Sequence, residues 1–461
     1  MTPPSPIPAE SIRLSPLAHQ LASRLHTALR ARWDALPINT ESPLPPEYTA
    51  APIPADLLGR RAELIVEASD VHALRQALAS DADAVVIDFD DTFAPTQANV
   101  QAAYDALAWA TQTEKPLLAR PRALYAVEEG LNFDGPGIAS LCDLAATVAA
   151  RPQQPLHLYI PKLETVAEAK FWEDALALAE TELELAPNSI RVCLQIETFS
   201  GVLHADALLY VLRGRAYGLN AGRWDYVFSL TKFVGKKSAA MPPRAELGMD
   251  VDAMRAYAEA LVRVCQRRNA AAIGGSAAVA PDAANPQSTL DTVQADKRRE
   301  AMQGFTAAWA GLPQLLGAVR AGFEGRSAEP LPPELPERTR ERLLNLPAAR
   351  PLPLETVQDT IGLALDVFKA WYVGSGVLVR GGRIEDTATA ELARAQLWQW
   401  VSCGAEMEGG ERLTPERYLQ ERRAQVDDSA PEARFLDHLV LNEICIPYFP
   451  RAAQQLMEGS A

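Results

Sequence analysis

The sequence of 461 residues contains few cysteines and no long hydrophobic run. Its five cysteines, Cys142, Cys193, Cys265, Cys403 and Cys445, are scattered and odd in number. This pattern argues against a disulfide framework or a thiolate metal cluster. It predicts that the protein is located in the reducing environment of the cytoplasm. No window approaches 18 uninterrupted apolar residues, and the N-terminus lacks a basic stretch followed by an apolar core. We therefore expect neither a membrane span nor export.

Positive charge, histidine and phosphate-binding glycines are also scarce. The chain has 44 Lys and Arg against 59 Asp and Glu, a net charge of -15, so it repels polyanions and nucleic acid is not an expected partner. Its six histidines show no spacing typical of metal ligands. Glu67-Ala68-Ser69-Asp70 follows the first expected strand, where a dinucleotide-binding fold would have a glycine-rich loop.

From residue 62 onward, short apolar segments alternate with amphipathic ones. The expected strands are 62–66, 84–88, 117–120, 156–162, 190–196, 216–219, 270–274 and 305–310. Eight strand-helix units over roughly 260 residues match an α/β fold of the (β/α)₈ TIM-barrel type. The alternative is an open doubly wound sheet, which the missing glycine-rich loop disfavours.

The rest of the chain is expected to be mostly helical. We divide the whole chain into an N-terminal helical and extended segment (1–60), the barrel (61–325), a proline-rich and charged linker (326–353) and a C-terminal helical domain (354–461).

Two apolar runs of the expected barrel end at the carboxylates of Glu197 and Asp225. Because the C-terminal ends of barrel strands meet at one rim, these two acids are candidates to hold one hard cation. Mg²⁺ is usually bound by one or two carboxylates, with water and substrate completing its octahedron. The alternative is that each acid is a helix cap or a salt-bridge partner.

Other charged residues follow the neighbouring strands: Asp88, Asp90 and Asp91 after the second, Arg120 and Arg122 after the third, and Lys162 after the fourth. Ion pairs that only close the barrel would explain them without a function. However, Arg120 and Arg122 flank Pro121, whose ring stiffens the backbone. This favours the interpretation that their guanidinium groups are held in place to bind an anionic oxygen.

Eight stretches, in order along the chain, resemble the malate synthase family in its shorter A-type form. They are Ala51-Pro52-Ile53-Pro54-Ala55-Asp56-Leu57, Arg120-Pro121-Arg122, Tyr159-Ile160-Pro161-Lys162-Leu163-Glu164, Gln195-Ile196-Glu197-Thr198, Gly218-Leu219-Asn220-Ala221-Gly222-Arg223-Trp224-Asp225-Tyr226, Ala272-Ile273-Gly274-Gly275, Ala295-Asp296-Lys297 and Ile384-Glu385-Asp386-Thr387-Ala388-Thr389-Ala390-Glu391. The fifth and eighth stretches are the most specific.

The resemblance implies a TIM barrel with a C-terminal helical plug, and an acyltransferase of the glyoxylate bypass that condenses acetyl-CoA with glyoxylate and releases malate and CoA. Carried over by position, it implies Mg²⁺ on Glu197 and Asp225. It also implies a glyoxylate site of Arg120, Glu197, Gly222, Arg223, Trp224 and Asp225. Arg120 would be the catalytic arginine and Asp386 the general base, with Thr92 and Pro313 in contact with acetyl-CoA.

Local pattern alone favours a different role for Asp386, because Glu385-Asp386-Thr387 precedes a helical run and an aspartate there is a common N-cap. The chain also departs from the family at Ala123-Leu124-Tyr125, at Asp90 in place of a glutamate, and at Ser276 in place of a methionine.

Two other functions remain open at this stage, a lyase of the citrate-lyase-β or malyl-CoA type and a non-catalytic paralogue that binds CoA or a 2-oxoacid. The number of chains per assembly is open as well, with a homo-oligomer as one alternative.

Overall fold

A closed ring of parallel strands forms the centre of the molecule in the computed structural model, which describes residues 12–36, 44–154, 156–235, 239–325, 328–451 and 453. The strands of the ring are β1 (Ala62–Glu67), β2 (Ala84–Asp88), β3 (Leu117–Arg120), β6 (His157–Ile160), β7 (Val192–Ile196), β8 (Ala216–Ala221), β9 (Ala271–Ile273) and β10 (Ala308–Ala310). Their order is β10-β1-β2-β3-β6-β7-β8-β9, and a parallel bridge between Ile273 and Ala307 joins the two ends. All eight expected strands are confirmed, and the open-sheet alternative is excluded.

The strands form because their apolar runs are covered on both faces. Every residue of β2 and β7 is buried, as is typical of parallel strands with helices outside and side chains inside. Large aromatic residues fill the interior of the barrel, among them Tyr159, Tyr217 and Trp309. The result is a packed core whose strand ends can carry a site.

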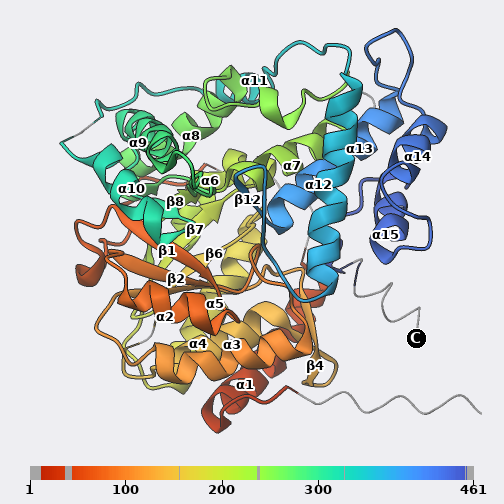
Figure 1. The fold of residues 1–461 in the computed structure, drawn as a ribbon. Coiled ribbons are helices and arrows are strands. Elements are labelled where there is room, and N and C mark those ends of the chain that lie inside the picture. Colours follow the sequence, from red (N-terminus) through yellow and green to blue (C-terminus); the bar gives the residue numbers. More distant parts are fainter. Residues whose placement is uncertain are drawn as a thin grey trace, which may run out of the picture.

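Helices surround the barrel (Figure 1). They are α2 (Val71–Ala79), α3 (Gln97–Ala110), α4 (Ala139–Ala150), α5 (Val166–Glu182), α6 (Phe199–Val211), α7 (Arg223–Val234), α8 (Asp252–Arg268), α9 (Pro286–Gln303) and α10 (Leu316–Phe323). The leading helix α1 (Pro16–Asp34) packs on α4 and α5. Side-chain caps fix where several begin; Thr198, for example, accepts a hydrogen bond from the N–H of Gly201 at 2.9 Å at the start of α6.

The C-terminal helices lie together beside α7 on one side of the barrel (Figure 1, blue). They are α12 (Leu354–Tyr372), α13 (Thr387–Cys403), α14 (Pro415–Arg423) and α15 (Pro431–Val440). They have a second apolar core of their own, which includes Phe368, Leu397 and Phe435. The expected helical character of this region is confirmed.

Three elements were not expected from the sequence. A hairpin of β4 (Val127–Asn132) and β5 (Pro136–Ile138) follows β3, and a second hairpin of β11 (Leu378–Arg380) and β12 (Arg383–Glu385) leads into α13. The segment interpreted as a linker contains helix α11 (Pro336–Leu343). These elements are short and partly exposed, so they lack the buried apolar runs that mark the barrel strands.

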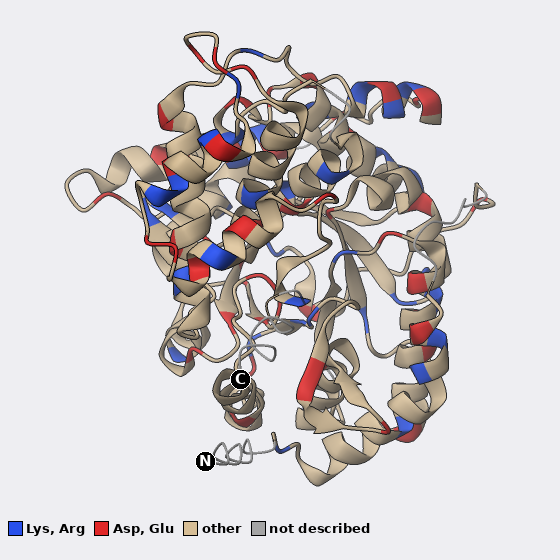
Figure 2. Cartoon of the chain, turned by 90° about the vertical axis from the view of Figure 1, so that its right-hand side faces the viewer, with Lys and Arg blue, Asp and Glu red and all other residues tan. Residues whose placement is uncertain are grey.

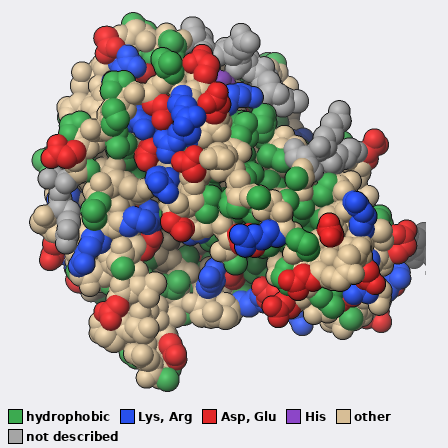
Figure 3. Space-filling view, turned by 90° about the horizontal axis from the view of Figure 1, so that it is seen from above, with side chains coloured by type: hydrophobic (Ala, Val, Ile, Leu, Met, Phe, Trp, Pro, Cys, Tyr) green, Lys and Arg blue, Asp and Glu red, His purple; other side chains and the backbone are tan. Residues whose placement is uncertain are grey.

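Charges of both signs are interspersed over the outer helices (Figure 2). On the face seen from above, a group of basic side chains is bordered by acidic ones (Figure 3). At about 0.1 M salt, dissolved ions largely screen such exposed charges from one another beyond about 10 Å. Among the described helices, none is long and apolar enough to cross a membrane.

Candidate active site

One large cavity, of about 1220 Å³, lies at the C-terminal ends of the barrel strands. Its lining includes all nine residues to which the family resemblance assigned a role: Thr92, Arg120, Glu197, Gly222, Arg223, Trp224, Asp225, Pro313 and Asp386. The first eight come from the barrel and its loops, whereas Asp386 comes from the C-terminal region. The structure therefore brings these residues together, and their individual roles stay predictions.

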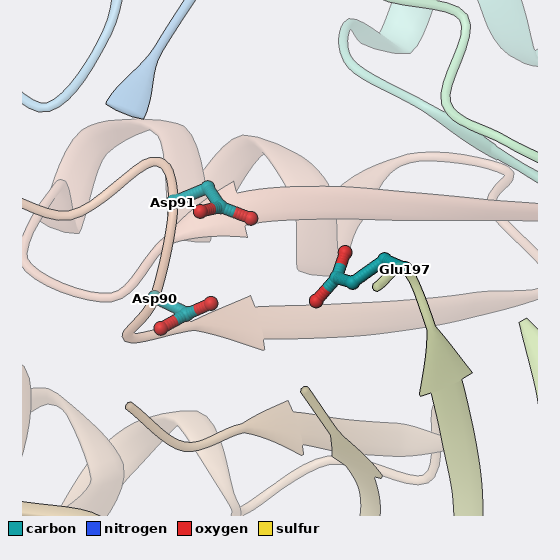
Figure 4. Close-up of side chains that lie close together, drawn as sticks. All are labelled: Asp90, Asp91 and Glu197. Atoms are coloured by element: carbon teal, nitrogen blue, oxygen red, sulfur yellow. The ribbon is translucent and has the colours of Figure 1, made fainter. Parts of the chain in front are cut away.

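Acidic side chains gather at one point of this rim. Asp90 and Asp91, on the turn after β2, face Glu197 at the end of β7, and one oxygen from each lies within 4.8 Å of the others (Figure 4). Asp225, in the first turn of α7, is also buried here. Carboxylates this close repel one another, so the cluster requires a compensating cation.

Lys162 supplies positive charge inside the cluster. Its ammonium donates to Asp90 and Asp91 at 2.7 Å each and to Asp225 at 3.2 Å, and it lies 3.6 Å from Glu197. The residue has a φ of 55°, a left-handed conformation that is uncommon for a side chain of this size. Sequence analysis placed Lys162 at the rim but not in the site, although its position after a barrel strand is the same signal that identified Glu197.

The donor set fits a hard divalent cation at Glu197 and Asp225. Both oxygens of Asp90 and Asp91 accept hydrogen bonds from Lys162, Arg120 or the N–H of Ala123. By contrast, Glu197 Oε2 and Asp225 Oδ1 are buried and have no hydrogen-bond partner in the part of the chain that the structure describes. Two buried carboxylate oxygens without partners are the ligands that Mg²⁺ prefers.

Burial raises the pKa of Glu197 to about 7 and raises the pKa of Asp225 well above its usual value, with the charge of Asp91 adding to both shifts. A bound cation would oppose these shifts, because it favours the ionised carboxylates.

Gly222 allows Glu197 to reach this position. A Cβ at residue 222 would overlap Glu197 Oε2 and lie 2.7 Å from Glu197 Cβ. The Gly222 N–H donates to the Tyr257 hydroxyl at 2.9 Å, and that hydroxyl donates to the Ile196 carbonyl at 2.6 Å. The loop and the strand end are thereby joined behind the glutamate.

Arg120 is held by several partners at once. Its Nε and Nη2 donate to the two oxygens of Asp88 at 2.5 and 2.6 Å, and its Nη1 donates to Asp91 at 2.9 Å and to Gln195 at 3.2 Å. The ring of Trp309 lies 5.2 Å from the guanidinium carbon. This planar fork fixes the orientation of a cation that lines the cavity.

Asp386 is both a helix cap and a cavity residue. Its Oδ1 accepts from the N–H of Thr389 at 3.1 Å, and the Thr389 hydroxyl accepts from the N–H of Asp386 at 2.9 Å. The N-cap interpretation is thus confirmed. Burial, together with the charge of Asp91, raises the pKa of Asp386 to about 7. A carboxylate with such a pKa can accept a proton near neutral pH.

Known protein families match both parts of the chain. A family model described as "Malate synthase, TIM barrel domain" matches residues 117–341, and one described as "Malate synthase, C-terminal" matches residues 354–443. Malate synthase of Streptomyces clavuligerus is 32% identical over 441 residues, covering 87% of this chain and 81% of that protein. The chain belongs to the malate synthase family. The resemblance found in the sequence is confirmed.

Other relatives extend the comparison. Malate synthase of Myxococcus xanthus (strain DK1622) is 33% identical over 403 residues, covering 80% of this chain and 74% of that protein. A Haloferax volcanii malate synthase, solved as a pyruvate/acetyl-CoA ternary complex, has a TM-score of 0.53 at 16% identity and covers 74% of this chain and 90% of its own. The latter likeness shows the shared fold.

The residues at which this chain departs from the malate synthase pattern make specific contacts in the structure or line the cavity. Ala123 donates its N–H to Asp90 at 3.1 Å, and Tyr125 stacks on Tyr448 with ring centroids 3.9 Å apart. Asp90, one methylene shorter than glutamate, still reaches Lys162. Arg120 keeps its partners in this context, and Ser276 lines the cavity.

Proposed function

We propose that the protein condenses acetyl-CoA with glyoxylate and then hydrolyses the thioester to give malate and CoA. The observation that carries this proposal is that Asp386, from the C-terminal region, lines the same cavity as Arg120, Glu197 and Asp225 from the barrel rim. A base, a fixed cation and a pair of carboxylates with unpartnered oxygens thereby face one space.

Proton abstraction is the first chemical requirement, because the acetyl methyl group is a very weak carbon acid. In this proposal Asp386 removes the proton, and its pKa of about 7 suits a base that works near neutral pH. Arg120 stabilises the enolate oxygen, since its guanidinium is already oriented by Asp88 and Asp91 and needs little reorganisation.

Glyoxylate would bind where the loop Gly222–Asp225 meets Glu197. Glu197 and Asp225 would hold Mg²⁺, which when bound polarises the aldehyde as a Lewis acid. Support comes from the two unpartnered oxygens of these carboxylates. Arg223 and Trp224 would surround the substrate carboxylate, and burial lowers the pKa of Arg223 only to about 10, so it stays cationic.

Acetyl-CoA would enter along Thr92 and Pro313, which line the same cavity. The division into an N-terminal segment (1–60), a barrel (61–325), a linker (326–353) and a C-terminal domain (354–461) is part of this proposal, with the metal on the barrel and the base on the C-terminal domain. A cytoplasmic location, suggested by the scattered cysteines, also belongs to it.

Release of free thiol tests the reaction. Protein is mixed with Mg²⁺, acetyl-CoA and glyoxylate, and CoA is followed over time. Prompt CoA release that depends on glyoxylate is the expected result. Cleavage of malyl-CoA without that condensation would favour the lyase alternative. Measurable binding of both substrates without turnover would favour a non-catalytic paralogue.

A further inference from the structure

Arg244 contacts the loop that begins α7 and, at the same time, the residue before Asp386. Its guanidinium carbon lies 4.3 Å from the ring centroid of Trp224. Its Nη1 donates to Glu385 Oε2 at 2.8 Å, in an ion pair whose side chains are 14% and 4% exposed. One side chain therefore joins the expected glyoxylate loop to the strand that ends next to the expected base.

The backbone that carries Arg244 is bound to α13, the helix that Asp386 caps. Three side chains of α13 make these bonds: Trp400 Nε1 donates to the Met241 carbonyl at 2.7 Å, Gln396 Nε2 donates to the Pro242 carbonyl at 2.7 Å, and Gln399 Oε1 accepts from the Met241 N–H at 2.9 Å. Because α7 and α13 also pack on each other, the loop, Arg244 and the base share one support.

These contacts require an arginine at position 244. A guanidinium can stack on an aromatic ring through its face while it donates to a carboxylate through its edge, and an ammonium has no such face. The guanidinium carbon of Arg223 also lies 4.0 Å from the ring centroid of Trp224, so two cations adjoin one ring. Glu385 pairs with Arg244, and the charge of Asp296 acts on Arg223, so each cation has an acid of its own.

We propose that Arg244 is a positioning residue that couples the loop at Trp224 to Asp386 through Glu385. The inference rests on the proposed function, in which this loop holds glyoxylate and Asp386 is the base. Glyoxylate that settles against Trp224 restrains Arg244, and Arg244 holds Glu385 and the start of α13 in place. Substrate binding on the barrel thereby fixes the base on the C-terminal side.

The coupling has an electrostatic consequence that can be measured. Asp386 is faced by Asp91 from the turn after β2 and by Arg120 from β3, and Glu385 precedes it on its own chain. Asp91 and Glu385 raise its pKa, whereas Arg120 lowers it. Removing Glu385 should therefore lower the pKa of Asp386. Removing Arg244, which offsets the charge of Glu385, should raise it.

The test compares Arg244→Gln, Glu385→Gln and the double variant with wild type. Each single change should lower kcat about 10- to 100-fold, because small misplacements of a reacting group are costly. The KM for acetyl-CoA should change little. The acid limb of the kcat–pH profile should move to lower pH in Glu385→Gln and to higher pH in Arg244→Gln, by about half a unit or more. The double variant should lose no more activity than the worse single one.

Two further variants complete the design. Arg244→Lys keeps the charge but not the planar fork, so it should fail to restore kcat. Arg380→Gln is the matched control: Arg380 pairs with Asp359 at 2.6 Å and Asp366 at 3.0 Å on α12, and its loss should leave kcat unchanged.

The outcomes separate the two proposals. Variants of Arg244 and Glu385 that match Arg380→Gln, or acid limbs that move in the same direction, would overturn the positioning role while the reaction stands. A wild-type protein without glyoxylate-dependent CoA release would overturn the proposed function and the inference with it.

Discussion

The Lys162 ammonium donates to one oxygen of Asp225 at 3.2 Å, while the other oxygen of that carboxylate is buried without a partner in the described chain. The same lysine lies 3.6 Å from Glu197 Oε1, and Glu197 Oε2 likewise has no partner there. Glu197 and Asp225 thus each have one oxygen near the Lys162 ammonium and one oxygen without a partner. The lysine compensates the acids, and the remaining oxygens are those that a divalent cation would use.

Replacing this lysine should make the fold depend on the metal. In Lys162→Met, buried carboxylates lose their common cation, a change that typically costs about 3–5 kcal/mol of folding stability. We expect a lower melting temperature without metal, and a larger rise on adding Mg²⁺ than in wild type. Lys115→Met is the control, because Lys115 binds the carbonyls of Ser80 and Ala82 and does not line the cavity. Equal responses to Mg²⁺ in Lys162→Met and wild type would refute the compensating role.

Gly222 should tolerate no side chain. In Gly222→Ala the new Cβ would overlap Glu197 Oε2, so the glutamate side chain must leave its present position. We expect Mg²⁺ affinity, measured by titration calorimetry, to fall at least about tenfold, as is typical when a metal ligand loses its support. Gly317→Ala, on α10, is the matched control because a Cβ there meets nothing within 4 Å. Unchanged Mg²⁺ binding by Gly222→Ala would show that Glu197 does not need this space.

Much of the barrel could be predicted because its strands are buried apolar runs between amphipathic helices. The rule that parallel strands end at one rim then placed Glu197, Asp225 and Arg120 together. The hairpin β11–β12 and the environment of Lys162 were not predicted. A φ of 55° at a lysine has no local sequence signal, and the ion pair between Arg244 and Glu385 joins residues 141 positions apart. Such features depend on tertiary packing.

The role of Asp386 could not be predicted from local pattern alone, because its sequence context fits a helix cap as well as a catalytic base. The structure shows that Asp386 is the cap of α13. Asp386→Asn separates the two roles, because asparagine caps a helix about as well as aspartate but cannot accept a proton. We expect this variant to stay folded and to bind glyoxylate and Mg²⁺ as wild type does, and to lose most turnover, about 100-fold or more. Asp386→Ala, which removes the cap, should be about 1 kcal/mol less stable than Asp386→Asn. An active Asp386→Asn enzyme would remove the base from this position.

The pH dependence of turnover should follow Asp386 as well. Its pKa is raised from 3.8 to about 7, chiefly by burial and by Asp91, and the base must be ionised to act. At saturating substrates and Mg²⁺, kcat should therefore rise with pH through about 7 and level off above it.

The folding stability should change with pH in the opposite direction. The folded state holds this proton more tightly than the unfolded chain, so the contribution of Asp386 to folding stability is full below about pH 4 and is lost as pH rises to about 7. Melting curves of wild type and Asp386→Asn, recorded in parallel from pH 4 to 8, isolate that effect because only wild type carries the titrating group. Wild type should lose stability relative to the variant across this range, and a constant difference between the two would contradict the raised pKa.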